Sequence, residues 1–448
     1  MLHNRGITGG QIESRVLISA ATAVDQHGEV SPAALLLEGD RIVQVGTPQA
    51  VGDVPGARMI DARHEVVLPG LVNAHAHLDL SGPGPMPYCG DFEQWLEAVL
   101  EIRWGSTPGD ITAAVQRGVE LSLAGGTALI GDISGMPHDP QFEALKASPL
   151  GGVSFQEFFG IGDAQQQTVA DMDRALATLD DAGEKLACGL SPHAPYTCGK
   201  EVIQAAVRRD VPVAIHVSES PEELEFLETG TGTFRQLSEH LKAWNDGVVI
   251  PNIHPVDFVA AQLAHGDEGV SASQVLFVHL NYIEPQHLDV LADAGVTAVY
   301  CPRASAYFGH PITGEHPYLA MLDRGIPVAL GTDSLLCLDT PDRISILDEM
   351  RFLYRRDSTP PQVLMHMATG NGAQGLGFGD RGLFDFKAES TTAGIMAVKA
   401  DCQLPRFVDI LQSDAPPRWL LAPRSWEARD RSSTREHDPA WCAPVVGA

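Results

Sequence analysis

The pattern of hydrophobic and polar residues changes near Leu68. Before it, short apolar runs separated by Gly, Pro and Asp fill Val16–Leu68 and predict a small β-structure without a long helix. After it, short apolar runs alternate with longer stretches of helical periodicity, which is typical of βα units and a parallel sheet. We therefore expect residues 1–68 to form the N-terminal part of a β side domain.

Eight apolar runs after Leu68 predict strands, and helical stretches such as ITAAVQRGVELSLAGG lie between many of them. The eight runs are LVNAHAH, TALIGDI, GVSFQEFFG, LACGLSPH, VPVAIHVSE, QVLFVHL, TAVYCP and IPVALGTD. This alternation favours an α/β fold with a closed, TIM-like (β/α)8 barrel over residues 69–375, although an open doubly wound sheet fits the pattern alone. The long connection between VPVAIHVSE and QVLFVHL predicts helices that cover a pocket.

The chain returns to β character after the eighth run. PPQVLMHMATGNGAQGLG predicts a helix with a glycine-rich end, and FDFKAES and AGIMAVKAD predict strands. These strands, within residues 376–425, are expected to complete the side domain, so that it is built from both chain ends. The polar tail, residues 426–448, has the composition of a disordered segment.

Composition narrows the class of protein further. The chain has 448 residues, 44% of them hydrophobic, but no run approaches the roughly 18 apolar residues of a membrane helix. The N-terminus lacks the apolar run of a secretory signal, and the seven scattered cysteines form no C-x-x-C pair. The net charge of −28 disfavours nucleic acid and anionic membranes as partners, although a salty habitat would also explain it. We expect a cytoplasmic protein that acts on a small molecule.

Five of the eight predicted strands end in side chains suited to metal or proton chemistry. In chain order these residues are His75, His77, His193, His216, Glu219, His279 and Asp333. The carboxyl ends of all strands emerge at one face of a parallel barrel, and residues two apart on a strand point the same way. Imidazole and carboxylate ligands suit Zn²⁺ and Fe²⁺, so this order of residues predicts a metal site.

Each of these residues also has an ordinary structural interpretation when taken alone. One H-x-H pair in a chain with 17 histidines can arise by chance, and a histidine at a strand end is often a hydrogen-bonded core residue. Asp333 could cap a helix, and Glu219 could be a solvated residue of the acidic run SESPEELE. The case for a metal site therefore depends on the order of the residues at successive strand ends.

Several motifs resemble those of the amidohydrolase superfamily, namely LPGLVNAHAHLDLSG, SPHAPYTCG, AIHVSES, FVHLNYI and ALGTDSLL. Within it they resemble the mononuclear group of adenosine-derivative, guanine and cytosine deaminases and triazine hydrolases. The resemblance extends from Val16 to Gly377 and implies hydrolysis of C–N or C–Cl bonds on a barrel. KAESTTAGIMAV departs from the group's usual glycine–lysine–alanine–aspartate turn, which leaves the register of the last side-domain strands open.

The resemblance also implies a role for each candidate residue. It implies that one Zn²⁺ or Fe²⁺ ion is bound by His75, His77, His216 and Asp333. Glu219 and His279 become the pair that handles protons, and His193 a substrate contact. These roles agree with physical chemistry, because a divalent cation lowers the pKa of bound water from 15.7 to about 7. Asp333 and His279 can then orient that water or accept its proton, and Glu219 can carry a proton to a ring nitrogen.

The substrate is less clearly indicated than the metal site. CPRASAYFGH, after the seventh predicted strand, resembles the aminodeoxyfutalosine deaminases and implies that Arg303 binds a substrate carboxylate. Arg303 could equally pair with an acidic side chain of the protein. We expect hydrolytic deamination of an aminated purine-like ring, with other C–N or C–Cl hydrolysis, or a barrel that binds without turnover, as alternatives. A homodimer is expected by analogy with the group.

Overall fold

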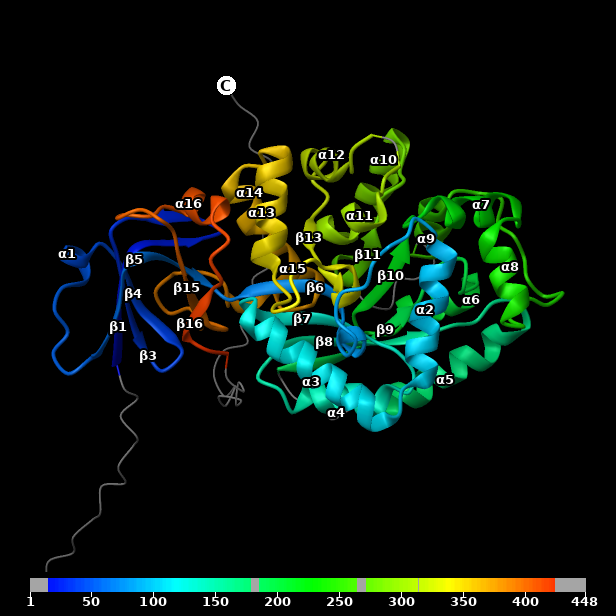
Figure 1. Cartoon of the computed structure of the whole chain (residues 1–448), viewed down its shortest axis with the longest axis horizontal. Coiled ribbons are helices and arrows are strands. Elements are labelled where there is room, and N and C mark those ends of the chain that lie inside the picture. The colour runs from blue at the N-terminus through cyan, green and yellow to red at the C-terminus, as the bar shows by residue number, and fades with distance from the viewer. Residues whose placement is uncertain (1–14, 179–184, 264–270, 313, 424–448) are drawn as a thin grey trace, which may run out of the picture.

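The computed structural model of the chain describes residues 15–178, 185–263, 271–312 and 314–423. Its strands form two sheets, one in a side domain and one in a barrel, and the two lie at opposite ends of the long axis in Figure 1. The tail predicted to be disordered, residues 426–448, lies outside the described residues. The predicted α/β class with two β-containing parts is confirmed.

The side domain contains a mixed sheet of strands from both chain ends, with the order β16-β15-β5-β1-β3-β4 and with β2 paired to β1. Its strands are β1 (Arg15–Asp25), β2 (Gly28–Val30), β3 (Ala33–Glu38), β4 (Arg41–Gly46), β5 (Arg58–Pro69), β15 (Ile395–Lys399) and β16 (Arg418–Leu421). Figure 1 shows the blue N-terminal strands beside the orange-red C-terminal ones. β15 pairs antiparallel with the end of β5, so the two ends of the chain share one hydrophobic core.

The barrel sheet is parallel, with the order β13-β12-β11-β10-β9-β8-β7-β6-β14. Its strands are β6 (Leu71–His77), β7 (Thr127–Ser134), β8 (Gly151–Phe158), β9 (Leu186–Pro192), β10 (Val213–Val217), β11 (Val275–His279), β12 (Thr297–Tyr300), β13 (Val328–Leu330) and β14 (Asp333–Ser334). The eighth predicted strand is divided, because β13 pairs with β12 whereas β14 pairs with β6. This change of partner closes the sheet into a TIM-like barrel, as predicted.

Helices follow most barrel strands and cover the outside of the sheet. The longer ones are α2 (Phe92–Gly105), α3 (Pro108–Ala124), α4 (His138–Lys146), α5 (Gln165–Thr178), α6 (Lys200–Val207), α7 (Pro221–Thr229), α8 (Thr233–His240), α9 (Pro255–Leu263), α10 (Pro285–Ala294), α13 (Ile346–Asp357) and α14 (Pro361–Ala368). Shorter ones are α1 (Pro48–Val51), α11 (Pro302–Phe308), α12 (Tyr318–Asp323), α15 (Gly370–Gly375) and α16 (Phe407–Gln412). The long connection between β10 and β11 carries α7, α8 and α9, which confirms the helices predicted there.

Two predicted elements differ from the structure. FDFKAES, residues 384–390, does not form a strand. A turn at Gly382, whose φ is 62°, precedes it, and the Phe386 N–H donates to the Asp25 carboxylate, so the segment folds as turns against the side domain. β5 is longer than the apolar run HEVVLP, residues 64–69, predicts, and it begins six residues before that run because Arg58–Ala62 pairs in parallel with β1.

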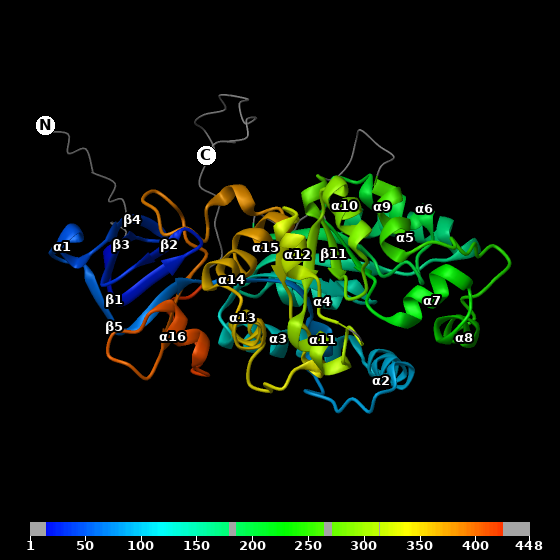
Figure 2. The ribbon, with the colours of Figure 1, turned by 90° about the horizontal axis from the view of Figure 1, so that it is seen from above.

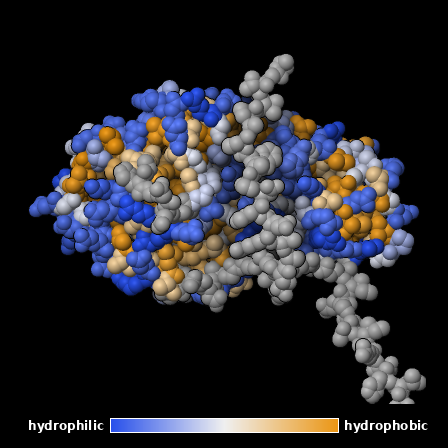
Figure 3. All heavy atoms as spheres, turned by 180° about the vertical axis from the view of Figure 1, so that it is seen from behind, coloured by the Kyte–Doolittle hydropathy of each residue, from blue (hydrophilic) through white to orange (hydrophobic). Residues whose placement is uncertain are grey.

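Hydrophobic residues concentrate inside the barrel and under its helices. β6, β7 and β8 are buried along their whole length, as expected for strands of a parallel sheet with both faces covered. The face shown in Figure 3 mixes hydrophilic and hydrophobic residues, with a hydrophobic group over the side domain. None of the helices in the described part of the chain has the length and apolarity needed to cross a bilayer.

Candidate active site

The polar residues predicted at strand ends meet at the carboxyl-terminal end of the barrel strands. Three turns there have an unusual backbone, with φ of 56° at Ser218 after β10, 77° at His279 on β11 and 59° at Asp333 on β14. Such left-handed conformations cost non-glycine residues roughly 1–3 kcal/mol and persist only where the surrounding structure holds them. Conformations of this kind concentrate at functional sites, which supports a functional role for this end of the barrel.

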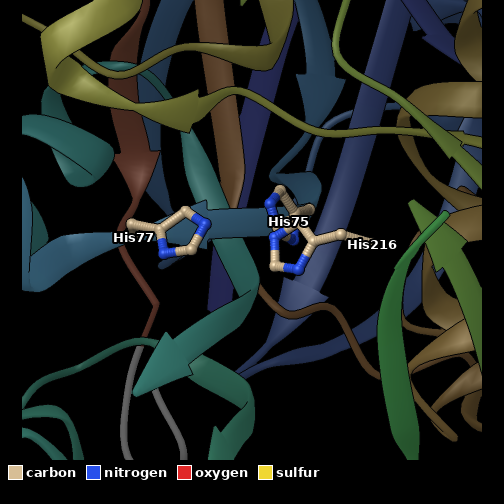
Figure 4. A group of neighbouring side chains, drawn as sticks. All are labelled: His75, His77 and His216. Atoms are coloured by element: carbon tan, nitrogen blue, oxygen red, sulfur yellow. The ribbon is translucent and has the colours of Figure 1, made fainter. Parts of the chain in front are cut away.

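Three histidines converge at this end. Figure 4 shows the imidazoles of His75 and His77, from β6, and His216, from β10, grouped around one space. One ring nitrogen of each lies within 4.8 Å of the others. His75 is fully buried, and neither of its ring nitrogens has a hydrogen-bond partner within the described structure. A buried imidazole without a partner is unfavourable unless a ligand satisfies it, so these residues fit a metal ion.

Neighbouring groups orient these rings for metal binding. Nδ1 of His216 lies 2.7 Å from the carbonyl oxygen of His193, to which it can only donate, and this leaves Nε2 of His216 free as a ligand. Oδ1 of Asp333 lies 3.7 Å from Nε2 of His77 and accepts the N–H of Ser334 at 2.7 Å. Burial raises the pKa of Asp333 to about 6. The structure thus brings the four predicted ligands together.

A second group beside these ligands consists of Glu219, His279 and Asp333. Oε1 of Glu219 lies 3.4 Å from Nε2 of His279. Burial, with the nearby carboxylates of Asp333 and Glu223 adding to it, raises the pKa of Glu219 well above its ordinary value. A raised pKa favours the protonated form of a carboxyl group, which is the form that acts as a general acid.

The turn that carries Glu219 is held by a buried carboxylate that the sequence did not single out. The two oxygens of Glu223, in the first turn of α7, accept the N–H groups of Ser218 and Glu219, each at 2.8 Å. From the other side, Asn281 donates to the carbonyl of Glu219 at 2.9 Å. The backbone of Glu219 is therefore fixed independently of its side chain.

His193, predicted as a substrate contact, follows β9 and is oriented by Thr197. Nδ1 of His193 lies 2.8 Å from the Thr197 hydroxyl, which itself donates to the carbonyl of Ala194. His193 therefore donates through Nδ1 and presents Nε2 as an acceptor. Burial lowers the pKa of His193 to about 3, which keeps the ring neutral.

A buried ion-pair network adjoins the histidines, and its acidic members were not predicted from the sequence. Arg103, at the end of α2, pairs with Asp79 at 3.0 Å and with Glu157 at 2.9 Å, and its Nη2 lies 3.3 Å from Nδ1 of His77. Burial opposes the charged form of Glu157, but Arg103, His193 and His216 together outweigh it and lower the pKa of Glu157. Glu157 lies within the third predicted strand and one residue before the end of β8, so the rule that selected the histidines applies to it as well.

Arg303 lies in an ion pair of the protein. Its Nε is 2.6 Å from Glu349 and its Nη1 is 2.9 Å from Asp339, and the side chain is buried on α11. The structure therefore favours the second interpretation of Arg303, an internal partner for acidic side chains. Contact with a substrate carboxylate remains a prediction.

The sequence model of the amidohydrolase family matches residues 66–385, which is more than half of the chain. The chain belongs to the amidohydrolase family. The matched region spans β6 to β14 and so includes every predicted site residue.

Two relatives of this amidohydrolase are named as deaminases of adenosine derivatives. The 5-methylthioadenosine/S-adenosylhomocysteine deaminase of Halobacterium salinarum is 28% identical over 377 residues, covering 80% of this chain and 79% of that protein. The aminodeoxyfutalosine deaminase of Deinococcus radiodurans is 28% identical over 382 residues, covering 81% of this chain and 86% of that protein.

Solved structures of similar fold include two enzymes that are named for different reactions. The aminofutalosine deaminase of Helicobacter pylori in complex with methylthio-coformycin has a TM-score of 0.74 at 21% identity, covering 92% of this chain and 100% of that one. The zinc-bound atrazine chlorohydrolase of Arthrobacter aurescens has a TM-score of 0.68 at 22% identity, covering 91% of this chain and 95% of that one. At this level of identity the two structures support the fold and leave the reaction open.

Proposed function

We propose that this amidohydrolase is a metal-dependent deaminase that replaces the ring amino group of an adenosine derivative by oxygen. The observation that carries the proposal is the buried pair of Glu219 and His279, 3.4 Å apart and next to the candidate metal ligands. A protein that only bound its ligand would have no need of a proton-handling pair. The names of the relatives supply the substrate class.

We assign the metal ligands to His75, His77, His216 and Asp333, and we propose Zn²⁺ or Fe²⁺ as the ion. When bound there, a divalent cation supplies a water molecule whose pKa is about 7. We propose one ion per chain. Glu157, His193 and His216 form another group of possible ligands, but Arg103 already places a positive charge 2.9 Å from Glu157 and opposes a second cation.

The residues around the metal ligands perform the proton transfers. Glu219, whose pKa burial raises well above its ordinary value, donates a proton to a ring nitrogen and makes the adjacent ring carbon electrophilic. His279 and Asp333 accept the proton of the attacking water as its oxygen bonds to that carbon. The C–N bond then breaks as that water proton passes to the amine, which leaves as ammonia. The C=O bond forms as the remaining hydroxyl proton passes to Glu219 and restores it. His193, through Nε2, accepts a hydrogen bond from the substrate.

The test is release of ammonia by metal-reconstituted protein from aminodeoxyfutalosine, methylthioadenosine, S-adenosylhomocysteine, adenosine, guanine and cytosine. We expect at least one to react, and we expect Glu219→Gln to lower kcat by about 10²–10⁴ with the metal retained. Glu228→Gln, at an exposed position of α7, is the matched control. Activity should also disappear on chelation.

Hydrolysis of a C–Cl or another C–N bond is the second candidate, since triazine hydrolases share the fold. If none of these compounds releases ammonia while the protein holds about one metal ion per chain, the deaminase proposal is contradicted. Chloride release from a chlorotriazine would then support the second candidate. A cytoplasmic location and a homodimer remain predictions.

A further inference from the structure

A cavity of about 360 Å³ opens beside the candidate active site. It lies between α2, the loops after β8 and β9, and α8, and Figure 2 shows α2 and α8 as neighbours on one side of the barrel. Most of its lining is apolar, and its size suits a small-molecule subsite.

The rim of the cavity is unusually hydrophobic. The lining includes Trp104, Met136, Phe159 and Leu241, whose exposed fractions are 69%, 62%, 43% and 38%. Ten large hydrophobic side chains are exposed in the described part of the chain, and four of them surround this one opening. Exposed apolar residues that gather in one patch mark a binding surface rather than ordinary surface composition.

The cavity is continuous with the catalytic groups. Glu157 and Thr197 line it, and both contact residues of the site. The Glu157 carboxylate lies within 4.8 Å of ring nitrogens of His193 and His216, and Thr197 accepts the hydrogen bond that orients His193. The cavity therefore begins one side chain away from the groups that handle the reacting ring.

The charges around the cavity exclude an anionic occupant. Among the described residues that line it, Arg103 is the only cationic one. Its Nε pairs with Asp79 and its Nη1 with Glu157, and both carboxylates are buried. Because Arg103 is already paired with two buried carboxylates, no positive charge is left for a carboxylate of the ligand. A ligand carboxylate in the cavity would be desolvated without an ion-pair partner, which is unfavourable.

We infer that this cavity binds a bulky, uncharged, apolar group of the substrate, distal to the ring that reacts, and selects against the same group when it carries a carboxylate. The inference rests on the proposed deaminase function for the identity of the ring. It differs from the sequence-based expectation of a carboxylate bound at Arg303, since Arg303 is paired elsewhere.

The test compares three compounds with the same reacting ring on the metal-loaded full chain. They are 5′-deoxyadenosine, its 5′-benzylthio derivative and the 4-carboxybenzylthio analogue. Since burial of each methylene is worth about fourfold, we expect kcat/KM for the benzyl thioether to exceed that for 5′-deoxyadenosine by roughly tenfold or more. The 4-carboxybenzylthio analogue should not show this gain in kcat/KM.

Two variants connect the preference to the cavity. Ala243→Phe fills the cavity from an exposed lining position, so it should abolish the gain in kcat/KM that the benzyl group gives over 5′-deoxyadenosine. Leu241→Arg supplies the missing cation and should favour the carboxylate, whereas Leu241→Gln should not. Leu404→Ala, an exposed hydrophobic in the C-terminal region between β15 and α16, is the control and should change nothing.

The outcomes separate the inference from the proposed function. If 5′-deoxyadenosine is deaminated but kcat/KM for the benzyl thioether is no higher, the inference is overturned and the proposed function stands. A higher kcat/KM for the carboxylate analogue than for the benzyl thioether has the same meaning. If none of the three is deaminated, equilibrium binding by calorimetry decides. Tighter binding of the benzyl thioether that Ala243→Phe abolishes supports the cavity and contradicts the deaminase, and equal or absent binding overturns both.

Discussion

At the scale of single residues, the position of Glu219 depends on one buried carboxylate. Glu223 accepts two backbone N–H groups, so Glu223→Gln replaces one of two acceptors by an NH₂ group that faces another donor. We predict that this change lowers kcat about 10- to 100-fold, the usual effect of disturbing a supporting hydrogen bond. Metal content should stay unchanged, because His216 is oriented by the carbonyl of His193 instead.

Steady-state kinetics and metal analysis measure the two effects separately. Glu228→Gln, on the exposed side of the same helix, is the control for a lost carboxylate. A loss of metal parallel to the loss of kcat would assign Glu223 a structural role and contradict the prediction. Full activity of Glu223→Gln would contradict it as well.

The residues at strand ends were predictable and their supporting partners were not. His75, His77 and Asp333 follow from the rule that parallel strands end at one face. Glu157 obeys the same rule and was overlooked because it lies within the apolar run GVSFQEFFG. Arg103 and Glu223 lie on helices whose amphipathic pattern explains them without a site, so only tertiary contacts distinguish them.

At the scale of elements, the closing strand determines the position of the metal ligands. The N–H of Thr332 donates to the carbonyl of His75 at 3.0 Å, and its hydroxyl accepts from Asn73 at 2.7 Å, where the chain changes partner from β12 to β6. A periodic apolar run predicts one continuous strand, and the division appears only when the ring of strands closes. The prediction of a strand at FDFKAES was wrong for a similar reason, since the hydrogen-bond partners of this segment come from residues far earlier in the chain.

Gly331 lies at this division and has no room for a side chain. A Cβ there would lie 2.9 Å from Cβ of His75 and 2.9 Å from Sγ of Cys301. We predict that Gly331→Ala displaces His75, lowers the free energy of unfolding by roughly 1–3 kcal/mol and weakens metal binding about tenfold or more. Urea denaturation and competition with a metal chelator measure the two effects.

The matched control is Gly109→Ala, because a Cβ at this helical position meets only Oγ1 of Thr107 at an ordinary 3.7 Å. Alanine favours helix, so this control should keep or slightly raise stability. Normal metal affinity in Gly331→Ala would show that the closing strand can move without moving His75, against the prediction.

At the scale of the whole molecule, folding should become less favourable in acid because neutral histidines are buried. His316 is the clearest case. Its Nε2 donates to the carbonyl of His279 at 2.8 Å, and its Nδ1 accepts the N–H of Tyr318 at 3.2 Å. A second proton on Nδ1 would face that N–H, and burial is the largest cause that lowers the pKa of His316 to about 3.

The sign of the pH dependence follows from this shift. The unfolded chain binds a proton at His316 near pH 6.5, whereas the folded chain does so only near pH 3, so the unfolded state binds more protons between these values. The contribution of His316 to stability is therefore complete above pH 6.5 and decreases by about 1.4 kcal/mol per pH unit as the pH falls towards 3.

Urea denaturation at pH 7.5, 5.5 and 4.5 should show His316→Gln less stable than the parent at pH 7.5, with a shallower decrease in acid. Because both proteins lose metal in acid, the difference in slope at equal metal concentration isolates the histidine, and the exposed His240→Gln should keep the parent slope. Parallel curves for His316→Gln and the parent would mean that the folded protein tolerates a protonated ring at this position, and the hydrogen bond from the Tyr318 N–H to Nδ1 would then have to break as the pH falls.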